Sequence, residues 1–166
     1  MDVTQEQHER AVADSFVEFY NRENGTDYRY HSRGEDPPDL IYRSGSHEMR
    51  LEITAAYYDT ENAAMLWQNA RGVPGARDIW ISKSPDVKLI ESINSTLAKK
   101  CVKRYPSGWV LLVDLYPDLV TAEEFADLIS EIQVPAGHPF AEIYVAGVFP
   151  ASSSGSRGGY HCWKLA

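Results

Sequence analysis

The chain has 166 residues, of which 43% are hydrophobic and 24% charged, and its formal net charge at pH 7 is −8. This composition is that of an ordinary globular protein, and no apolar run reaches the roughly 18 residues that a membrane-spanning helix needs. The acidic balance argues against a strong non-specific nucleic-acid binder, because phosphate affinity comes mostly from Lys and Arg, although it does not exclude a nucleic-acid partner.

The N-terminal segment 4–23 predicts an amphipathic helix, because apolar residues recur at helical spacing from Val12 to Tyr20. Glu9 lies on the same stripe, one turn before Val12. A short strand is expected over 28–32. It is followed by the sequence Gly-Glu-Asp-Pro-Pro, which is typical of a rigid turn.

The next segment predicts a β-hairpin whose register can be derived from its pattern. Residues 40–43 and 47–54 flank a Ser-Gly-Ser turn signal. If Arg43 pairs with Glu48, then Asp39 lies opposite Glu52, with Cβ atoms roughly 5 Å apart. The other face is then entirely apolar, and a slip by one residue would scatter this set. Its members are Leu40, Tyr42, Met49, Leu51 and Ile53.

Helices and strands alternate over the middle of the chain. A helix is expected from Thr60 to about Arg71, and 78–83 is a short apolar piece of undetermined type. The segment 86–104 predicts a long helix with one apolar face. Basic residues gather near its end, namely Lys99, Lys100, Lys103 and Arg104.

The C-terminal part begins with the near-continuous apolar run 109–115, which is typical of a strand buried on both faces. Thr121 and Glu124 form a capping-box pattern that predicts a helix to about Ile132. Two last strands are expected over 141–149 and 160–165, joined by a Ser/Gly-rich loop.

This order predicts an α/β fold with a central mixed β-sheet flanked by helices, formed by one domain over residues 1–166. The cysteines, Cys101 and Cys162, have no metal-type spacing, which indicates reduced residues. The first residues are polar and acidic, unlike a signal peptide. We therefore expect a cytoplasmic protein without a membrane partner. The sequence leaves the oligomeric state open.

The order αβββαβ, with Pro38-Asp39 opening the second strand and Glu52 in the third, resembles the PD-(D/E)XK nuclease superfamily, which has the restriction-endonuclease-like fold. The resemblance covers about residues 4–115, and a helix and two strands extend it. It implies a Mg²⁺- or Mn²⁺-dependent nuclease that hydrolyses phosphodiester bonds in DNA or RNA, with DNA favoured. Asp39 and Glu52 would hold the metal with the backbone carbonyl of Ile53, and Glu9 matches the acid that many members contribute from the first helix.

The sequence departs from this family at one position, because Thr54 stands where the motif has lysine. The loss of one positive charge beside the reacting phosphate typically costs about 10²–10³ in rate. Thr54 can hydrogen-bond a water but cannot supply that charge. Lysine migration occurs in this fold, and Lys100 is the best substitute because it borders the apolar stripe of the long helix. Lys83 and Lys103 are weaker candidates.

Other interpretations remain open from the sequence. Asp39 and Glu52 would also suit a solvated pair of acids bridged by Arg43 or Arg50, and Lys100 a solvated helix lysine. The main functional alternative is a catalytically inactive member of the fold that binds nucleic acid or a protein. Three aromatic residues suit either base stacking or packing, namely Tyr57, Tyr58 and Trp67.

Overall fold

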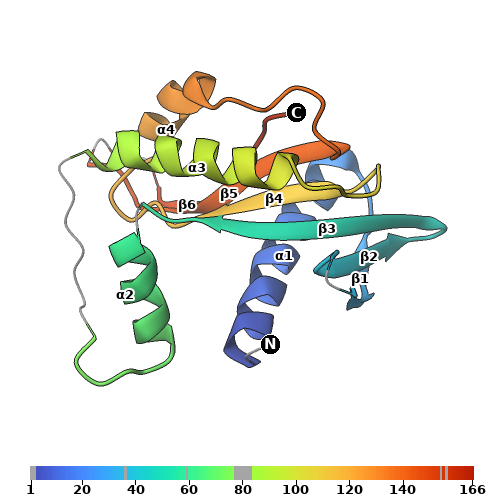
Figure 1. Ribbon diagram of the computed structural model, residues 1–166, viewed down its shortest axis with the longest axis horizontal. Coiled ribbons are helices and arrows are strands. Elements are labelled where there is room, and N and C mark those ends of the chain that lie inside the picture. The colour runs from blue at the N-terminus through green and yellow to red at the C-terminus, as the bar shows by residue number, and fades with distance from the viewer. Residues whose placement is uncertain (1–2, 36, 59, 77–83, 154, 156) are drawn as a thin grey trace.

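A sheet of six strands in the order β1-β2-β3-β4-β5-β6 organises the protein in the computed structural model (Figure 1). The structure describes residues 3–35, 37–58, 60–76, 84–153, 155 and 157–166. The strands are β1 (Arg29–Arg33), β2 (Leu40–Ser44), β3 (His47–Ala56), β4 (Val110–Leu115), β5 (Glu142–Phe149) and β6 (Gly159–Lys164). The helices are α1 (Val3–Asn24), α2 (Thr60–Ala70), α3 (Pro85–Cys101), α4 (Ala122–Leu128) and the 3₁₀ turn η1 (Ile129–Glu131).

The sheet is mixed, as predicted. Strands β1, β2 and β3 pair antiparallel, β3 pairs parallel with β4 and β4 with β5, and β6 closes the edge antiparallel to β5. Parallel neighbours need long crossover connections, and here these contain α2 and α3 before β4 and α4 before β5. The predicted α/β class with a central mixed sheet is therefore confirmed.

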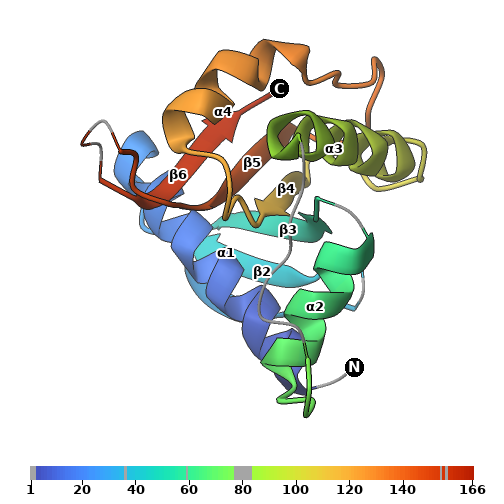
Figure 2. The same cartoon turned by 90° about the vertical axis from the view of Figure 1, so that its left-hand side faces the viewer.

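Helices cover both faces of the sheet. In Figures 1 and 2, α3 and α4 lie on one face and α1 on the other. Strand β4 is buried along its whole length: Leu111 and Val113 pack in the α3 layer, and Val110 and Leu112 pack in the α1 layer. This is the burial on both faces that the near-continuous apolar run predicted.

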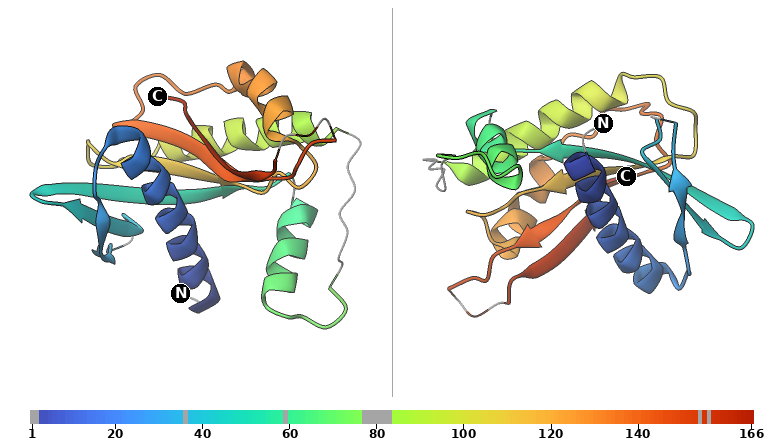
Figure 3. Two further views of the ribbon diagram at one scale, coloured as in Figure 1. Left: turned by 180° about the vertical axis from the view of Figure 1, so that it is seen from behind. Right: turned by 90° about the horizontal axis from the view of Figure 1, so that it is seen from below.

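Helix α2 stands beyond the end of β3, on the same side of the sheet as α1 (Figure 3). It contacts α1 through Trp67, whose ring centroid lies 5.7 Å from that of His8. The segment 60–71 is therefore a helix, as expected, and it packs beside the N-terminal part of α1.

The observed boundaries differ from the expected ones mainly at two helix ends. Helix α3 ends at Cys101 rather than at Arg104. Pro106 follows a few residues later, and the helical conformation is unfavourable for the residue before a proline. Helix α4 has the predicted capping box between Thr121 and Glu124, but it passes into a 3₁₀ turn at Ile129. The apolar piece 78–83 lies outside the described residues. None of the described helices has the length and apolarity to cross a bilayer.

Candidate functional site

The predicted hairpin register is confirmed at every strand position. Arg43 pairs with Glu48, and the pairing continues to Leu40 opposite Leu51. Asp39 comes directly before β2, and its backbone N–H donates to the carbonyl of Leu51 at 3.1 Å. Leu51 already pairs with Leu40, so the regular ladder ends there, and the predicted place of Asp39 opposite Glu52 lies beyond it. Asp39 nevertheless packs against β3, because its side chain also accepts a hydrogen bond from Ile53.

Asp39 is a buried acid, with 7% of its surface exposed. Its Oδ2 accepts a hydrogen bond of 2.7 Å from the backbone N–H of Ile53. Burial raises the pKa of Asp39 to about 6; the Ile53 hydrogen bond opposes this shift, the charges of Glu52 and Glu9 add to it, and the Lys100 charge opposes it. Asp39 therefore carries a negative charge that the fold does not fully compensate.

Glu52 is also buried, with 4% of its surface exposed. Its Oε1 accepts two hydrogen bonds, from Lys100 Nζ at 2.7 Å and from the Tyr105 hydroxyl at 3.0 Å. Its Oε2 is buried and has no partner among the described residues. An unpartnered buried carboxylate oxygen is costly, so this atom marks a place for a cation or an ordered water.

The solvated-pair interpretation of these two acids is wrong. Both acids are buried, and the arginines proposed to bridge them bind elsewhere on the hairpin. Arg43 Nη2 lies 2.9 Å from a Glu48 carboxylate oxygen, and Arg50 Nε lies 2.8 Å from the other. The space between Asp39 and Glu52 is thus not filled by either arginine.

Lys100 comes from the last turn of α3 and is not a solvated helix lysine. Its side chain is 18% exposed, and its ammonium group pairs with Glu52. The two weaker candidates for the motif lysine are not placed at the acids: Lys103 is exposed, and Lys83 lies outside the described residues. A lysine charge is therefore present beside the acids although β3 itself carries Thr54.

The carbonyl of Ile53 points toward the same open edge as Asp39. In an extended strand the N–H and C=O of one residue point to the same side. The N–H of Ile53 donates to Asp39, and the carbonyl of Leu51 accepts from Asp39. Since β2 begins only at Leu40, β3 has no β2 partner opposite Ile53, and its carbonyl is directed at the Asp39 corner.

Glu9 and Thr54 lie at the margin of this site. Glu9 is held by Gln5 Nε2 at 3.0 Å and by Arg33 Nη2 at 3.2 Å, so its charge is partly compensated. Both Glu9 and Thr54 line a cavity of about 220 Å³ beside Ile53. Among the described residues, no three His, Cys, Asp or Glu side chains form a group that could hold a metal ion. A metal site here would thus consist of two carboxylates and one carbonyl.

The same cavity contains a pair that the sequence did not reveal. His8 Nε2 lies 3.3 Å from Asp114 Oδ2 and also contacts the Tyr116 hydroxyl. The hydrogen bond that His8 donates to Asp114 raises the pKa of His8. These residues are more than 100 positions apart in the chain. The available signal was Asp114 itself, the one charged residue within an otherwise apolar strand.

The three aromatic residues considered for base stacking pack within the protein. The Tyr57 ring stacks on Tyr116 with centroids 4.9 Å apart, and Trp67 meets His8 edge-on. Tyr58 is 3% exposed, and its hydroxyl accepts from the backbone of Leu119. The packing interpretation is the one that the structure supports.

Gly34 lies in the turn before Asp39, where the backbone is too crowded for a larger residue, and this gives a first prediction. Its N–H donates to the Asp39 carbonyl at 3.0 Å, and a Cβ atom at this position would overlap the Pro38 carbonyl. Gly34→Ala is expected to lower the free energy of unfolding by about 1–3 kcal/mol, because the Pro38 backbone must move. Urea denaturation measures this change.

Gly159→Ala is the matched control, because a Cβ there meets nothing within 4 Å. This variant should differ from wild type by less than about 0.5 kcal/mol. Equal stability of the Gly34 and Gly159 variants would show that the turn before Asp39 is not tightly constrained.

Compared with protein-family models, with curated proteins and with solved structures, the chain shows no significant match.

Proposed function

We propose that the protein is a Mg²⁺-dependent nuclease with a restriction-endonuclease-like core of the PD-(D/E)XK type, and that it hydrolyses phosphodiester bonds in DNA in preference to RNA. The observation that carries the proposal is the arrangement of Asp39 and Glu52. Both carboxylates are buried and close enough that the Glu52 charge raises the pKa of Asp39. One Glu52 oxygen has no partner among the described residues, and the ammonium of Lys100 lies 2.7 Å from the other oxygen.

The order of the elements supports the proposal. A helix is followed by three antiparallel strands, a further helix pair and a strand parallel to the third. Helix α2 is an insertion relative to the order αβββαβ, and α4, β5 and β6 extend it. Fold alone is a weak guide to function, so the proposal depends on the site.

The oxygen atoms at the site suit a hard divalent cation. Mg²⁺ is commonly held by one or two carboxylates, with water and substrate phosphate completing the shell. Asp39, the free Glu52 oxygen and the carbonyl of Ile53 would hold it here. When bound, the ion would supply polarisation of the phosphate and a lower pKa for an attacking water.

Lys100 supplies the charge that Thr54 does not. Its ammonium is fixed by Glu52, which the Tyr105 hydroxyl also contacts, so its position is set before substrate binds. A preorganised positive charge next to a reacting phosphate is worth about 10²–10³ in rate. The Thr54 hydroxyl, at the same edge, would hydrogen-bond a water.

A cleavage assay tests this proposal. Wild-type protein should cut labelled DNA when Mg²⁺ or Mn²⁺ is added, and Asp39→Ala should remove the activity because one of two acidic ligands is lost. Glu48→Gln is the matched control: this acid belongs to the same hairpin but binds Arg43 and Arg50, so the variant should cut at the wild-type rate. An inactive wild type, or an active Asp39→Ala protein, would refute the nuclease proposal.

One observation favours a second function. The Lys100 ammonium already balances one oxygen of Glu52 without any metal, which suits a catalytically silent domain that binds nucleic acid or a protein partner. Titration calorimetry separates the two functions. A nuclease should bind Mn²⁺ at this site, whereas a silent binding domain should bind its partner and take up no Mn²⁺.

A further inference from the structure

A groove of about 390 Å³ runs along α3, where this helix faces the end of β3 and the start of α2. One face of α3 forms most of its floor. The residues on that face are Lys88, Glu91, Ser92, Ser95, Thr96 and Lys99. Their spacing of three and four residues places them on one side of the helix. The α3 side of the groove is therefore rich in ammonium and hydroxyl groups.

The groove differs in charge from the protein as a whole. The chain has a formal net charge of −8, yet among the described lining residues Glu91 is the single acid against two lysines. Lys99 is exposed, and it forms no side-chain hydrogen bond or ion pair with a described residue. Lys103 and Arg104, both exposed, follow just beyond the end of α3. A local basic track thus crosses an acidic molecule.

This track leads to the candidate active site. Lys99 and Lys100 are adjacent in the last turn of α3, and their side chains have different partners. Lys99 lines the groove, whereas Lys100 binds Glu52. The β3 side of the groove is formed by Ala55 and Tyr57, a few residues beyond Glu52. A chain lying in the groove would therefore reach the two acids at the Lys99 end.

We propose that this groove binds the sugar-phosphate backbone of one nucleic-acid strand. Lys and Ser/Thr side chains are common partners of phosphate oxygens, and such contacts position a strand without reading its sequence. The distance along α3 from Lys88 to Lys99 is about 16 Å, which is long enough to contact more than one phosphate of a strand. The inference rests on the proposed function and identifies the surface that holds its substrate.

Fluorescence anisotropy with a short labelled DNA strand of mixed sequence tests the groove. The measurement is made in EDTA, so that binding is separated from cleavage, and over a series of salt concentrations. Lys99→Gln should weaken binding by about three- to tenfold and lower the salt slope by about 0.7, the value for one phosphate contact to a single strand. Glu91→Gln should strengthen binding, because it removes the negative charge from the groove.

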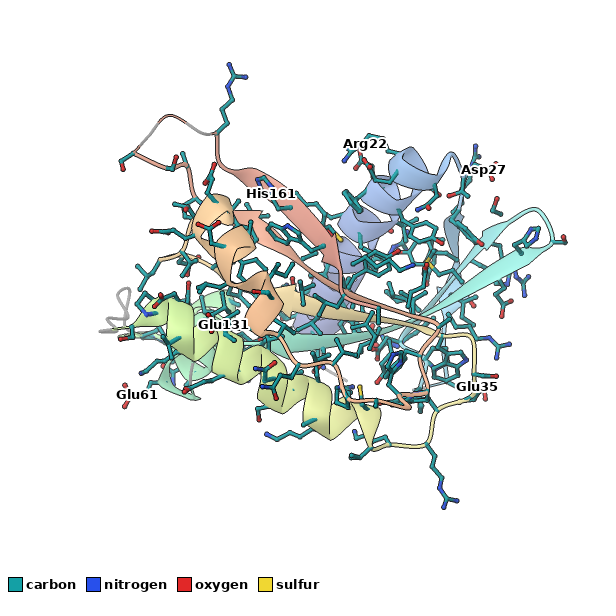
Figure 4. All side chains as sticks on the ribbon, turned by 90° about the horizontal axis from the view of Figure 1, so that it is seen from above. Arg22, Asp27, Glu35, Glu61, Glu131 and His161 are labelled. Atoms are coloured by element: carbon teal, nitrogen blue, oxygen red, sulfur yellow. The ribbon has the colours of Figure 1, made fainter. Side chains whose placement is uncertain are left out.

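Arg22→Gln is the control for net charge. It removes one positive charge from an exposed side chain near the end of α1, far from α3 in Figure 4. This variant should bind as wild type does. Equal affinities of the Lys99 and Arg22 variants, or no gain for Glu91→Gln, would overturn the groove assignment even if the protein cuts DNA.

The remaining outcomes separate the groove from the nuclease proposal. Binding that depends on Lys99 in a protein that cuts nothing would support the groove and refute the nuclease. Wild-type protein that binds neither the DNA strand nor its RNA counterpart would refute both. Polyglutamate that binds the protein as tightly as the DNA strand, with the same dependence on Lys99, would assign the groove to an acidic peptide and overturn the proposal.

Discussion

Lys100→Met is expected to lower the free energy of unfolding by about 3–5 kcal/mol, because it leaves a buried carboxylate without its cation. Glu52 is 4% exposed, and Lys100 is its cationic partner in the described structure. The same change should reduce cleavage by about 10²–10³-fold through loss of the positioned charge. Urea denaturation at neutral pH and the cleavage assay measure the two effects.

Two comparisons make this prediction specific. Lys99→Met changes the neighbouring, exposed lysine and should alter stability by less than about 0.5 kcal/mol. Adding Glu52→Gln to Lys100→Met should recover most of the lost stability, because the buried charge disappears with its partner. If Lys100→Met costs no more than Lys99→Met, the pair is screened by solvent and Lys100 is not fixed at the site.

Asp39→Asn is expected to stabilise the protein above about pH 6. The pKa of Asp39 is about 6, against about 3.9 for an unperturbed aspartate. The folded protein therefore holds this proton more tightly than the unfolded chain, and its free energy of unfolding falls as the pH rises from about 4 to 6. The total is about 3 kcal/mol. The Asn amide oxygen still accepts from Ile53.

The pH series of the difference between wild type and variant isolates this effect from other acids. The gain in stability of Asp39→Asn should be absent near pH 4, should grow between about pH 4 and 6, and should then stay constant. Urea denaturation at each pH gives the curve. A difference that does not change with pH would mean that Asp39 titrates normally in the folded protein.

These two predictions share a physical origin. Burying an acid without full compensation lowers stability, and natural proteins accept such costs mainly at functional sites. Asp39 and the unpartnered Glu52 oxygen are both of this kind. By contrast, the partly exposed acid Glu48 of the same hairpin is bound by two arginines. This contrast within one hairpin supports a functional origin for the buried pair.

The hairpin was the part of the site that sequence could predict. Its side chains alternate with a period of two, and a single register places Leu40, Met49 and Leu51 on one face. Extended by one residue, that register brought Asp39 next to β3, where its side chain accepts from Ile53. The capping box at Thr121 was equally local, because its two partners are three residues apart.

Long-range geometry was harder to predict. The pattern of α3 identified Lys100 as a residue bordering the buried stripe, but its contact with Glu52 depends on how α3 crosses β3, which no local pattern specifies. The His8–Asp114 pair joins the first helix to β4, and a single polar residue in an apolar strand does not identify its partner. The expected end of α3 was wrong because helical periodicity continued into a segment that turns before Pro106.

Titration calorimetry with Mn²⁺ tests the central claim most directly, namely that Asp39 and Glu52 together hold a divalent ion. Wild-type protein at neutral pH should bind one ion. Asp39→Asn should bind none or bind far more weakly, and Glu48→Gln should match wild type. Affinity should rise as the pH increases through about 6, because the ligand must be deprotonated. No binding by the wild type, or equal binding by the Asp39 variant, would contradict the claim.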